Sequence, residues 1–166
     1  MKLFMDTTYF LPAIGVSTKG IEDNVPLKIL KEGHDIAISD LTLFELSAIG
    51  AKYVASGKMP EERAIYGIRS LTNDERISKV TPYKEGVLPL AFAFRRILSD
   101  FIDCLILASA IRECDALATE DSELIGIREQ KAFTTIIASV NKNFKIAKAG
   151  FLSACMIDYL LCGTSP

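Results

Sequence analysis

Apolar and polar positions along this chain fall into two alternating kinds of segment. Short apolar runs that end at an acid, a hydroxyl residue or a proline are typical of buried strands. Longer segments carry apolar residues three or four positions apart, which is typical of helices, and several of them end at a glycine. Strands are predicted over residues 2–6, 35–39, 76–81 and 116–119. Helices are predicted over residues 9–14, 24–31, 41–56, 60–71, 86–98 and 101–114, and a further helical turn from Ser122.

Strands that alternate with helices in this way indicate a parallel sheet with helices on both faces. We therefore predict an α/β protein with three layers, α/β/α, around a central parallel sheet of about five strands. In the less readable tail, residues 134–137 are interpreted as the fifth strand and residues 151–162 as a mostly buried helix. Because no repeat or linker divides the chain, we expect a single domain over residues 1–166. Residues 125–166 are expected to form a C-terminal extension that packs on it or forms an oligomer contact.

The composition is that of a globular protein with an unusually apolar character. Charged residues make up 24% and hydrophobic residues 49% of the chain, and the mean hydropathy is +0.26. Buried parallel strands would account for this value, and so would an apolar interface between subunits. The apolar segment 151–162, whose only charge is Asp158, favours an interface, and we predict a homodimer.

Net charge and the lengths of the apolar runs argue against two broad classes of protein. The formal net charge is −2, so the chain is not a polycation that binds duplex nucleic acid through its charge alone. Residues 1–6 do not resemble a signal peptide. The longest apolar stretches, residues 87–94 and 151–162, fall short of the ~20 residues that span a bilayer. We expect a cytoplasmic protein with no membrane contact.

The cysteines and the single histidine give no sign of a zinc site or a disulfide framework. No two cysteines form a C-x-x-C pair, and none lies beside His34. We therefore interpret the cysteines as free thiols: Cys104, Cys114, Cys155 and Cys162. His34 follows a glycine at a predicted helix end, and we interpret it as a loop residue with no catalytic role.

Acidic residues follow three of the predicted strands. Asp6 ends the first strand, and Asp121 follows the fourth. Asp40 and Glu45 come just after the second strand. Since ligands of a parallel sheet bind outside the carboxyl ends of its strands, these acids are expected to meet at one edge. Asp103 joins them if the start of its helix points to the same edge.

Each acid also has a structural explanation. Asp6 is as well suited to capping the next helix as to catalysis, and Asp40 is interpreted as an N-cap. Asp121 could cap the helical turn that follows it. Glu45 and Asp103 are harder to explain in this way, because each stands among apolar residues, where a carboxylate is costly to bury without a cation. Taken together, the acids favour a functional site.

Several carboxylates at one edge would raise one another's pKa unless a cation lay between them. No lysine or arginine stands next to Asp6 or Asp103 in the sequence. A site of carboxylate oxygens without histidine or cysteine suits Mg²⁺ or Mn²⁺ better than zinc. These ions activate water and neutralise phosphate groups, so the acids point to phosphodiester hydrolysis.

Four motifs in this chain resemble those of the PIN-domain family, and within it the VapC-type toxin ribonucleases. The matching segments are KLFMDTT (residues 2–8), SDLTLFEL (39–46), DCLILASA (103–110) and LATED (117–121). Each motif alone is weak, but their order and their placement on strands and helices make the similarity specific. The resemblance covers residues 1 to 124.

The resemblance implies a PIN fold, Mg²⁺- or Mn²⁺-dependent cleavage of RNA, and an antitoxin protein as the partner of such a toxin. It implies metal ligation by four acids: Asp6, Glu45, Asp103 and Asp121. It also suggests that the hydroxyl of Thr7 or Thr119 orders a metal-bound water. Asp100 departs from the pattern as an additional acid on the helix face of Asp103, where it is either a ligand or a helix cap. The region after Leu124 is longer than expected of a compact toxin.

Two other functions are weighed against a ribonuclease. An aspartyl-phosphate phosphohydrolase would need a second Asp two residues after the first, but Thr8 occupies that position. A noncatalytic PIN-like module that binds RNA or protein would have no use for all four acids. Basic residues in two segments are candidate RNA contacts and are explained equally well by solvent exposure: Arg95 and Arg96, and Lys142, Lys145 and Lys148.

Overall fold

The protein is built around one parallel sheet. The computed structural model describes residues 1–22 and 24–148. The strands are β1 (Lys2–Met5), β2 (Asp35–Ser39), β3 (Ile77–Val80), β4 (Ala116–Ala118) and β5 (Lys145–Ala147). All four neighbouring pairs are parallel, in the order β3-β2-β1-β4-β5. The chain therefore moves from β1 to one side of the sheet and later returns to the other side. The gap between β1 and β4 is a switch point of the kind where ligands of such sheets bind.

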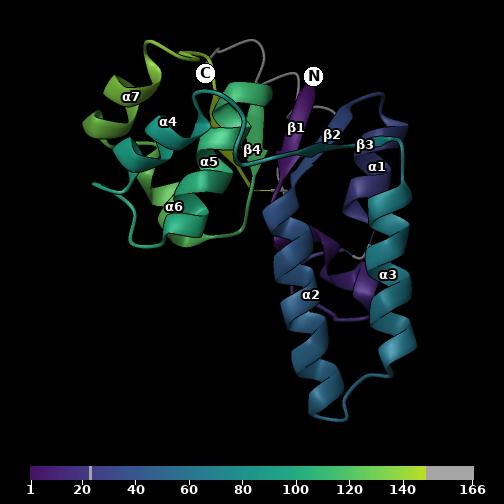
Figure 1. Cartoon of the computed structure of the whole chain (residues 1–166). Coiled ribbons are helices and arrows are strands. Elements are labelled where there is room, and N and C mark those ends of the chain that lie inside the picture. The colour runs from purple at the N-terminus through teal and green to yellow at the C-terminus, as the bar shows by residue number, and fades with distance from the viewer. Residues whose placement is uncertain (23, 149–166) are drawn as a thin grey trace.

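Helices cover both faces of this sheet, as predicted (Figure 1). One face carries the 3-10 helix η1 (Thr7–Ile14) and the helices α1 (Val25–Lys31), α2 (Asp40–Ala55) and α3 (Glu61–Asn73). The other face carries α4 (Val87–Phe94), α5 (Phe101–Glu113), α6 (Ser122–Ile127) and α7 (Lys131–Ile137). The fold is thus the predicted three-layer α/β/α arrangement around a central parallel sheet of five strands.

The two faces of the sheet bury two separate hydrophobic clusters. In β1, Leu3 and Met5 pack toward the α2–α3 side, whereas Phe4 packs toward the α4–α5 side. In β2, Ala37 packs toward the same side as Phe4, whereas Ile36 and Ile38 pack toward the α2–α3 side. Successive strand residues point to opposite faces, so a strand that is apolar throughout serves both clusters. This arrangement accounts for much of the positive mean hydropathy.

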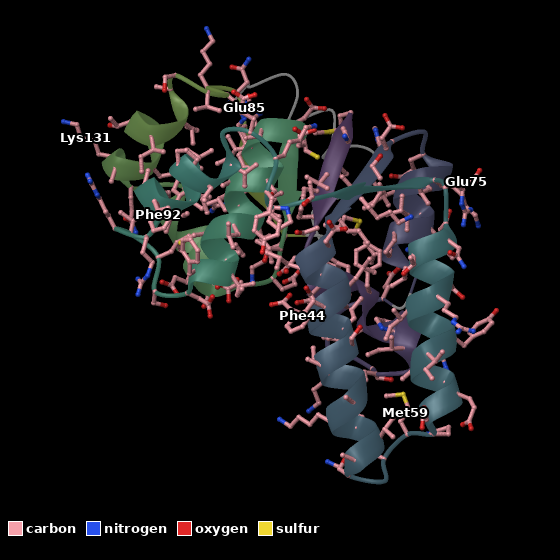
Figure 2. All side chains as sticks on the ribbon, viewed as in Figure 1. Phe44, Met59, Glu75, Glu85, Phe92 and Lys131 are labelled. Carbon is pink, nitrogen blue, oxygen red and sulfur yellow. The ribbon has the colours of Figure 1, made fainter. Side chains whose placement is uncertain are left out.

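Helices α2 and α3 form a hairpin that extends well beyond the sheet, with Met59 near its far end (Figures 1 and 2). Its base is held against η1 by a close backbone contact at Gly67, where a Cβ atom would overlap the carbonyl group of Ala13. Arg63 adds hydrogen bonds from its guanidinium group to the carbonyl oxygens of Pro12 and Ala13. The hairpin is therefore fixed to the first segment after β1.

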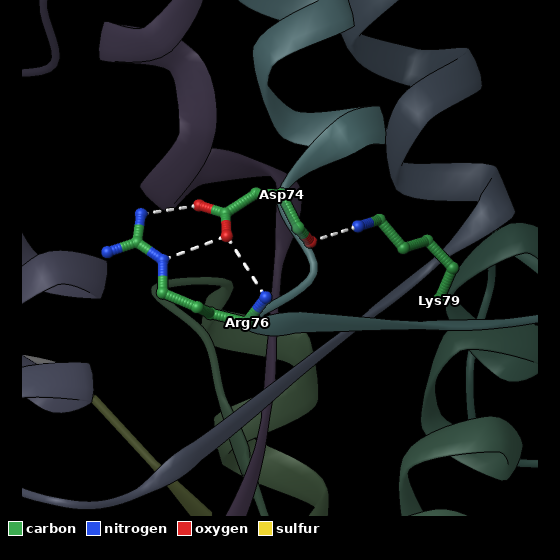
Figure 3. Close-up of polar contacts among 3 residues, drawn as sticks. All are labelled: Asp74, Arg76 and Lys79. Carbon is green, nitrogen blue, oxygen red and sulfur yellow. Dashed lines mark hydrogen bonds and ion pairs between the residues drawn. The ribbon is translucent and has the colours of Figure 1, made fainter.

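A polar turn sets the start of β3 (Figure 3). The carboxylate of Asp74 accepts hydrogen bonds from the backbone and the guanidinium group of Arg76, at 2.7–3.0 Å. These bonds hold the pKa of Asp74 below its usual value. Lys79 donates to the carbonyl oxygen of Asp74. The turn reverses the chain between α3 and the sheet.

The prediction of a strand over residues 134–137 is wrong. These residues form the second half of α7, and the fifth strand is β5, which the sequence analysis missed. The β-branched pairs in this segment favour a strand, but Phe133 and Ile137 lie one helical turn apart and are both buried. The ring of Phe133 packs on that of Phe94, with centroids 5.9 Å apart. Tertiary packing therefore overrides local propensity here.

Three smaller predictions also need correction. The helix after β1 is a 3-10 helix that begins at Thr7. Helix α4 ends at Phe94 rather than at residue 98, because the chain turns there into the start of α5. The N-cap of α2 is Ser39, whose hydroxyl accepts from the backbone NH of Leu41, and Asp40 is the first helical residue.

The segment 151–162, with Cys155 and Cys162, lies outside the described residues. In the described part, no helix has the length and apolar character that crossing a membrane requires.

Candidate functional site

A pocket of about 560 Å³ opens at the carboxyl ends of β1 and β4. Its walls come from η1, α2, α5 and the segment after β4. The residues that line it are Asp6, Thr7, Thr8, Leu11, Glu45, Ala48, Ile49, Asp103, Glu120 and Asp121. The structure therefore brings together all four acids that the PIN-like motifs single out, from four different segments of the chain.

Asp6 lies where β1 passes into η1. Its Oδ1 caps η1 by accepting from the backbone NH of Thr7 at 2.7 Å, and its Oδ2 accepts from the Thr119 hydroxyl at 2.7 Å. The backbone NH of Asp6 also donates to the carbonyl oxygen of Ala118, which extends the β1–β4 pairing. Burial raises the pKa of Asp6, and the two hydrogen bonds oppose that rise. Asp6 is thus both a helix cap and a pocket residue.

Glu45 reaches the pocket from the second turn of α2. The hydroxyl of Thr7, which is buried, donates a hydrogen bond to Oε2 of Glu45. Burial raises the pKa of Glu45, the bond from Thr7 opposes this, and the charges of Asp6 and Asp100 add to it. Thr7 and Thr119 therefore each orient one carboxylate of the pocket.

Asp103 is a pocket carboxylate with a strongly raised pKa. It lies in the first turn of α5 and is partly buried. Burial, together with the charges of four other carboxylates led by Asp100 and Asp121, raises the pKa of Asp103 to about 7. No hydrogen bond to the Asp103 carboxylate offsets this among the described contacts. A carboxylate placed in this way is stabilised in its charged form by any cation that enters the pocket.

The remaining acids divide into caps and pocket residues. Asp121 lines the pocket and also caps α6, because its Oδ1 accepts from the backbone NH groups of Glu123 and Leu124. Asp100 caps α5 through the backbone NH of Ile102 at 2.6 Å and does not line the pocket. Asp40, expected at the same edge, is exposed and does not line it either.

Glu120 is a pocket residue that the sequence analysis did not single out. Its Oε1 accepts a hydrogen bond from the Tyr9 hydroxyl at 2.8 Å, and its Oε2 lies 3.8 Å from Nζ of Lys148. Glu120 stands between Thr119 and Asp121 in the fourth motif, and this position could have identified it from the sequence as a pocket residue. The tail lysine is thereby brought to the edge of the pocket.

The chemistry of the pocket fits a hard divalent cation, although no finished binding site is present. Its charged lining groups are all carboxylates, and burial together with neighbouring negative charge raises the pKa of several of them. In residues 1–22 and 24–148, no group of three or more His, Cys, Asp or Glu side chains is arranged to hold a metal ion as it stands.

The histidine and the two cysteines within residues 1–22 and 24–148 do not line the pocket. His34 lies in the loop before β2, as expected, within 3.4 Å of the N-terminal amine. Cys104 and Cys114 are free and buried, which confirms the thiol prediction for these two. Burial raises the pKa of Cys114 to about 12, so this thiol stays protonated and unreactive.

Comparison with known proteins shows the fold and the family of this chain. One chain of the crystal structure of VapBC2 from Rickettsia felis bound to a DNA fragment from their promoter matches with a TM-score of 0.53 and 21% identity. The match covers 80% of this chain and 95% of that one, and it supports the fold. No curated protein matches. The PIN domain, however, matches residues 3–129, which include all the acids of the pocket. The chain therefore belongs to the PIN-domain family, whose members are typically nucleases.

Proposed function

We propose that this protein is a metal-dependent endoribonuclease that cleaves RNA in the presence of Mg²⁺ or Mn²⁺. The observation that carries the proposal is the convergence of acids from four segments on one pocket, with the pKa of Asp103 raised to about 7. Burying like charges together destabilises the metal-free protein, so the arrangement makes sense if a cation offsets them.

In this proposal the cation is held by Asp6, Glu45, Asp103 and Asp121. When bound, it supplies Lewis-acid activation of water and neutralisation of phosphate charge. Thr119 fixes the orientation of Asp6, and Thr7 fixes that of Glu45, so each hydroxyl is a positioning group. Asp100 contributes negative charge from its capping position without lining the pocket.

We further propose that the protein acts as a toxin with an antitoxin partner, in the cytoplasm and as a homodimer. The support is the fold shared with a chain of a VapBC2 complex and the strongly negative pocket, which a basic side chain of a partner could fill. Neutralising that basic residue in the partner should weaken inhibition. Light scattering that reports a monomer at high micromolar concentration would remove the dimer from this proposal.

The test of the enzyme proposal is cleavage of a single-stranded oligoribonucleotide by the purified full chain. Cleavage is expected with Mn²⁺ or Mg²⁺, none with EDTA, and none by Asp103→Asn. The matched control is Asp40→Asn, which changes an acid of α2 outside the pocket and should cleave normally. Cleavage that survives EDTA, or that Asp103→Asn retains, contradicts the proposal.

A noncatalytic PIN-like module that binds RNA or protein is the second candidate. One observation favours it, namely that the described carboxylates are not grouped as a finished metal site. Calorimetric titration with Mn²⁺ distinguishes the two candidates. If the protein is the proposed enzyme, the unmutated chain gives a heat of Mn²⁺ binding that Asp103→Asn loses. If it is a noncatalytic module, neither the unmutated chain nor Asp103→Asn gives a site-specific heat.

A further inference from the structure

An exposed aromatic side chain stands beside the acidic pocket. Phe44 precedes Glu45 on α2 and has 70% of its surface exposed. Figure 2 shows it projecting from α2 on the side toward α5 and α6. Single exposed apolar side chains are common on protein surfaces, so exposure alone carries no argument. Phe44 is distinguished by its position relative to the pocket.

Helix geometry places Phe44 at the rim of the pocket. Ala48, four residues later, lies on the same face of α2 one turn along and lines the pocket. Leu41, three residues earlier, packs on the hydrophobic cluster of the α4–α5 side. Phe44 therefore lies between a packed residue and a pocket residue, with its ring left uncovered. Ala48 is small and adds little bulk between the position of Phe44 and the pocket.

A basic side chain lies beside the same pocket. Nζ of Lys148 lies 3.8 Å from Oε2 of the lining residue Glu120. A cationic group at the edge of an acidic centre suits a ligand whose phosphates pass over the pocket. A single such contact is too little to hold a duplex through its phosphates alone.

Resting on the ribonuclease proposal, we propose that Phe44 is a stacking platform for one unpaired base of a single-stranded RNA substrate. Aromatic faces bind bases of any sequence in single strands, whereas the bases of a duplex are already stacked on both sides. An aromatic ring at the rim, the amine of Lys148 at the edge and a carboxylate centre together match a single strand more closely than a protein segment. Phe44 would then make the site selective for single-stranded over duplex RNA, while the site would accept different base sequences.

Binding of a fluorescein-labelled single-stranded oligoribonucleotide to the full chain tests this, measured by anisotropy with Mn²⁺ in the Asp103→Asn background. Phe44→Ala should weaken binding about tenfold and Phe44→Trp should restore it, in line with the energy of one base stacked on an aromatic ring. Tyr66→Ala is the matched control, because Tyr66 on α3 is also 70% exposed but does not line the pocket. It should change binding less than twofold.

A second oligonucleotide separates stacking from a structural effect. With abasic sites along the strand, the penalty of Phe44→Ala should disappear, since no base is left to stack. Three outcomes overturn the stacking role and leave Phe44 as a contact for protein. Phe44→Ala could weaken binding of normal and abasic strands equally, could weaken binding of neither, or the protein could show no detectable RNA binding. Cleavage by the unmutated chain is scored separately. RNA binding that depends on Phe44 without any cleavage would reject the ribonuclease proposal alone.

Discussion

The hydroxyl of Thr119 donates a 2.7 Å hydrogen bond to Oδ2 of Asp6, across 113 residues of sequence. The same hydroxyl oxygen accepts from the backbone NH of Asp121 at 3.0 Å. One buried side chain thus connects the ends of β1 and β4 and two acids of the pocket.

Replacing Thr119 by Val should remove both bonds while keeping the side-chain shape. We expect a loss of about 1–3 kcal/mol in the free energy of unfolding, because Val leaves a buried NH and a buried carboxylate oxygen without partners. We also expect a marked loss of RNA cleavage, since Asp6 is no longer oriented. Urea denaturation and the cleavage assay measure the two effects. Thr119→Ser keeps the hydroxyl and should behave much like the unmutated chain; equal damage from both substitutions would show that only the methyl group matters.

Neutralising Asp103 should stabilise the metal-free protein and abolish cleavage. In the absence of a cation this half-exposed carboxylate is surrounded by negative charge, so Asp103→Asn should raise the free energy of unfolding by roughly 0.5–2 kcal/mol at pH 8. Thermal melts in EDTA measure this. A destabilised Asp103→Asn protein would identify Asp103 as a structural residue.

The same carboxylate should make the stability of the metal-free protein depend on pH. Its folded-state pKa of about 7 lies above the ordinary aspartate value of 3.8, so the folded state holds more protons than the unfolded state between those values. The stabilising contribution is therefore present at low pH and is lost as the pH rises toward 7. Melts of the unmutated protein and of Asp103→Asn should converge near pH 4 and diverge toward pH 8. A difference that does not vary with pH would contradict this assignment.

Divalent metal should stabilise the unmutated protein more than the Asp103→Asn protein. At ten times its dissociation constant, a ligand that binds only the folded state adds about 1.4 kcal/mol. Thermal shift with Mn²⁺, with Asp40→Asn as the matched acidic control, measures the difference. An identical response of all three proteins would place the ion outside the pocket.

Gly67→Ala should be one of the more damaging small substitutions in the protein. The added methyl group would overlap the backbone of Ala13, and backbone cannot move aside as a flexible side chain can. We expect a loss of about 1–3 kcal/mol in the free energy of unfolding. Gly126→Ala in α6 is the control, since open space surrounds the position and Ala favours helices. Urea denaturation should show opposite signs for the two.

The pocket was more predictable from the sequence than the C-terminal half of the fold. Asp6 and Asp121 directly follow strands, so their meeting at one edge follows from parallel pairing alone. Glu45 and Asp103 were marked by their apolar surroundings. The roles of Thr7 and Thr119 as hydrogen-bond donors to particular carboxylates, and the Lys148–Glu120 approach, depend on side-chain positions that no spacing rule gives.

Strand β5 and helix α7 show where the local sequence pattern fails to predict the structure. Residues 134–137 have the composition of a strand but pack as a helix, because Phe133 and Ile137 meet the α4–α5 side only at helical spacing. Strand β5 has three residues, too few to stand out before its pairing with β4 is known.

The strand order also decides when the pocket can exist during synthesis. Strand β1 is translated first, but its partner β4 pairs Leu117 with Phe4 and cannot emerge until most of the chain has been made. Contacts of such long sequence separation form late in folding. A nascent chain that has exposed Asp6 and Glu45 still lacks Asp103 and Asp121. For a protein proposed to cleave RNA, this delays the assembly of the proposed site until residues 103–121 have been synthesised at the ribosome, which is itself largely RNA.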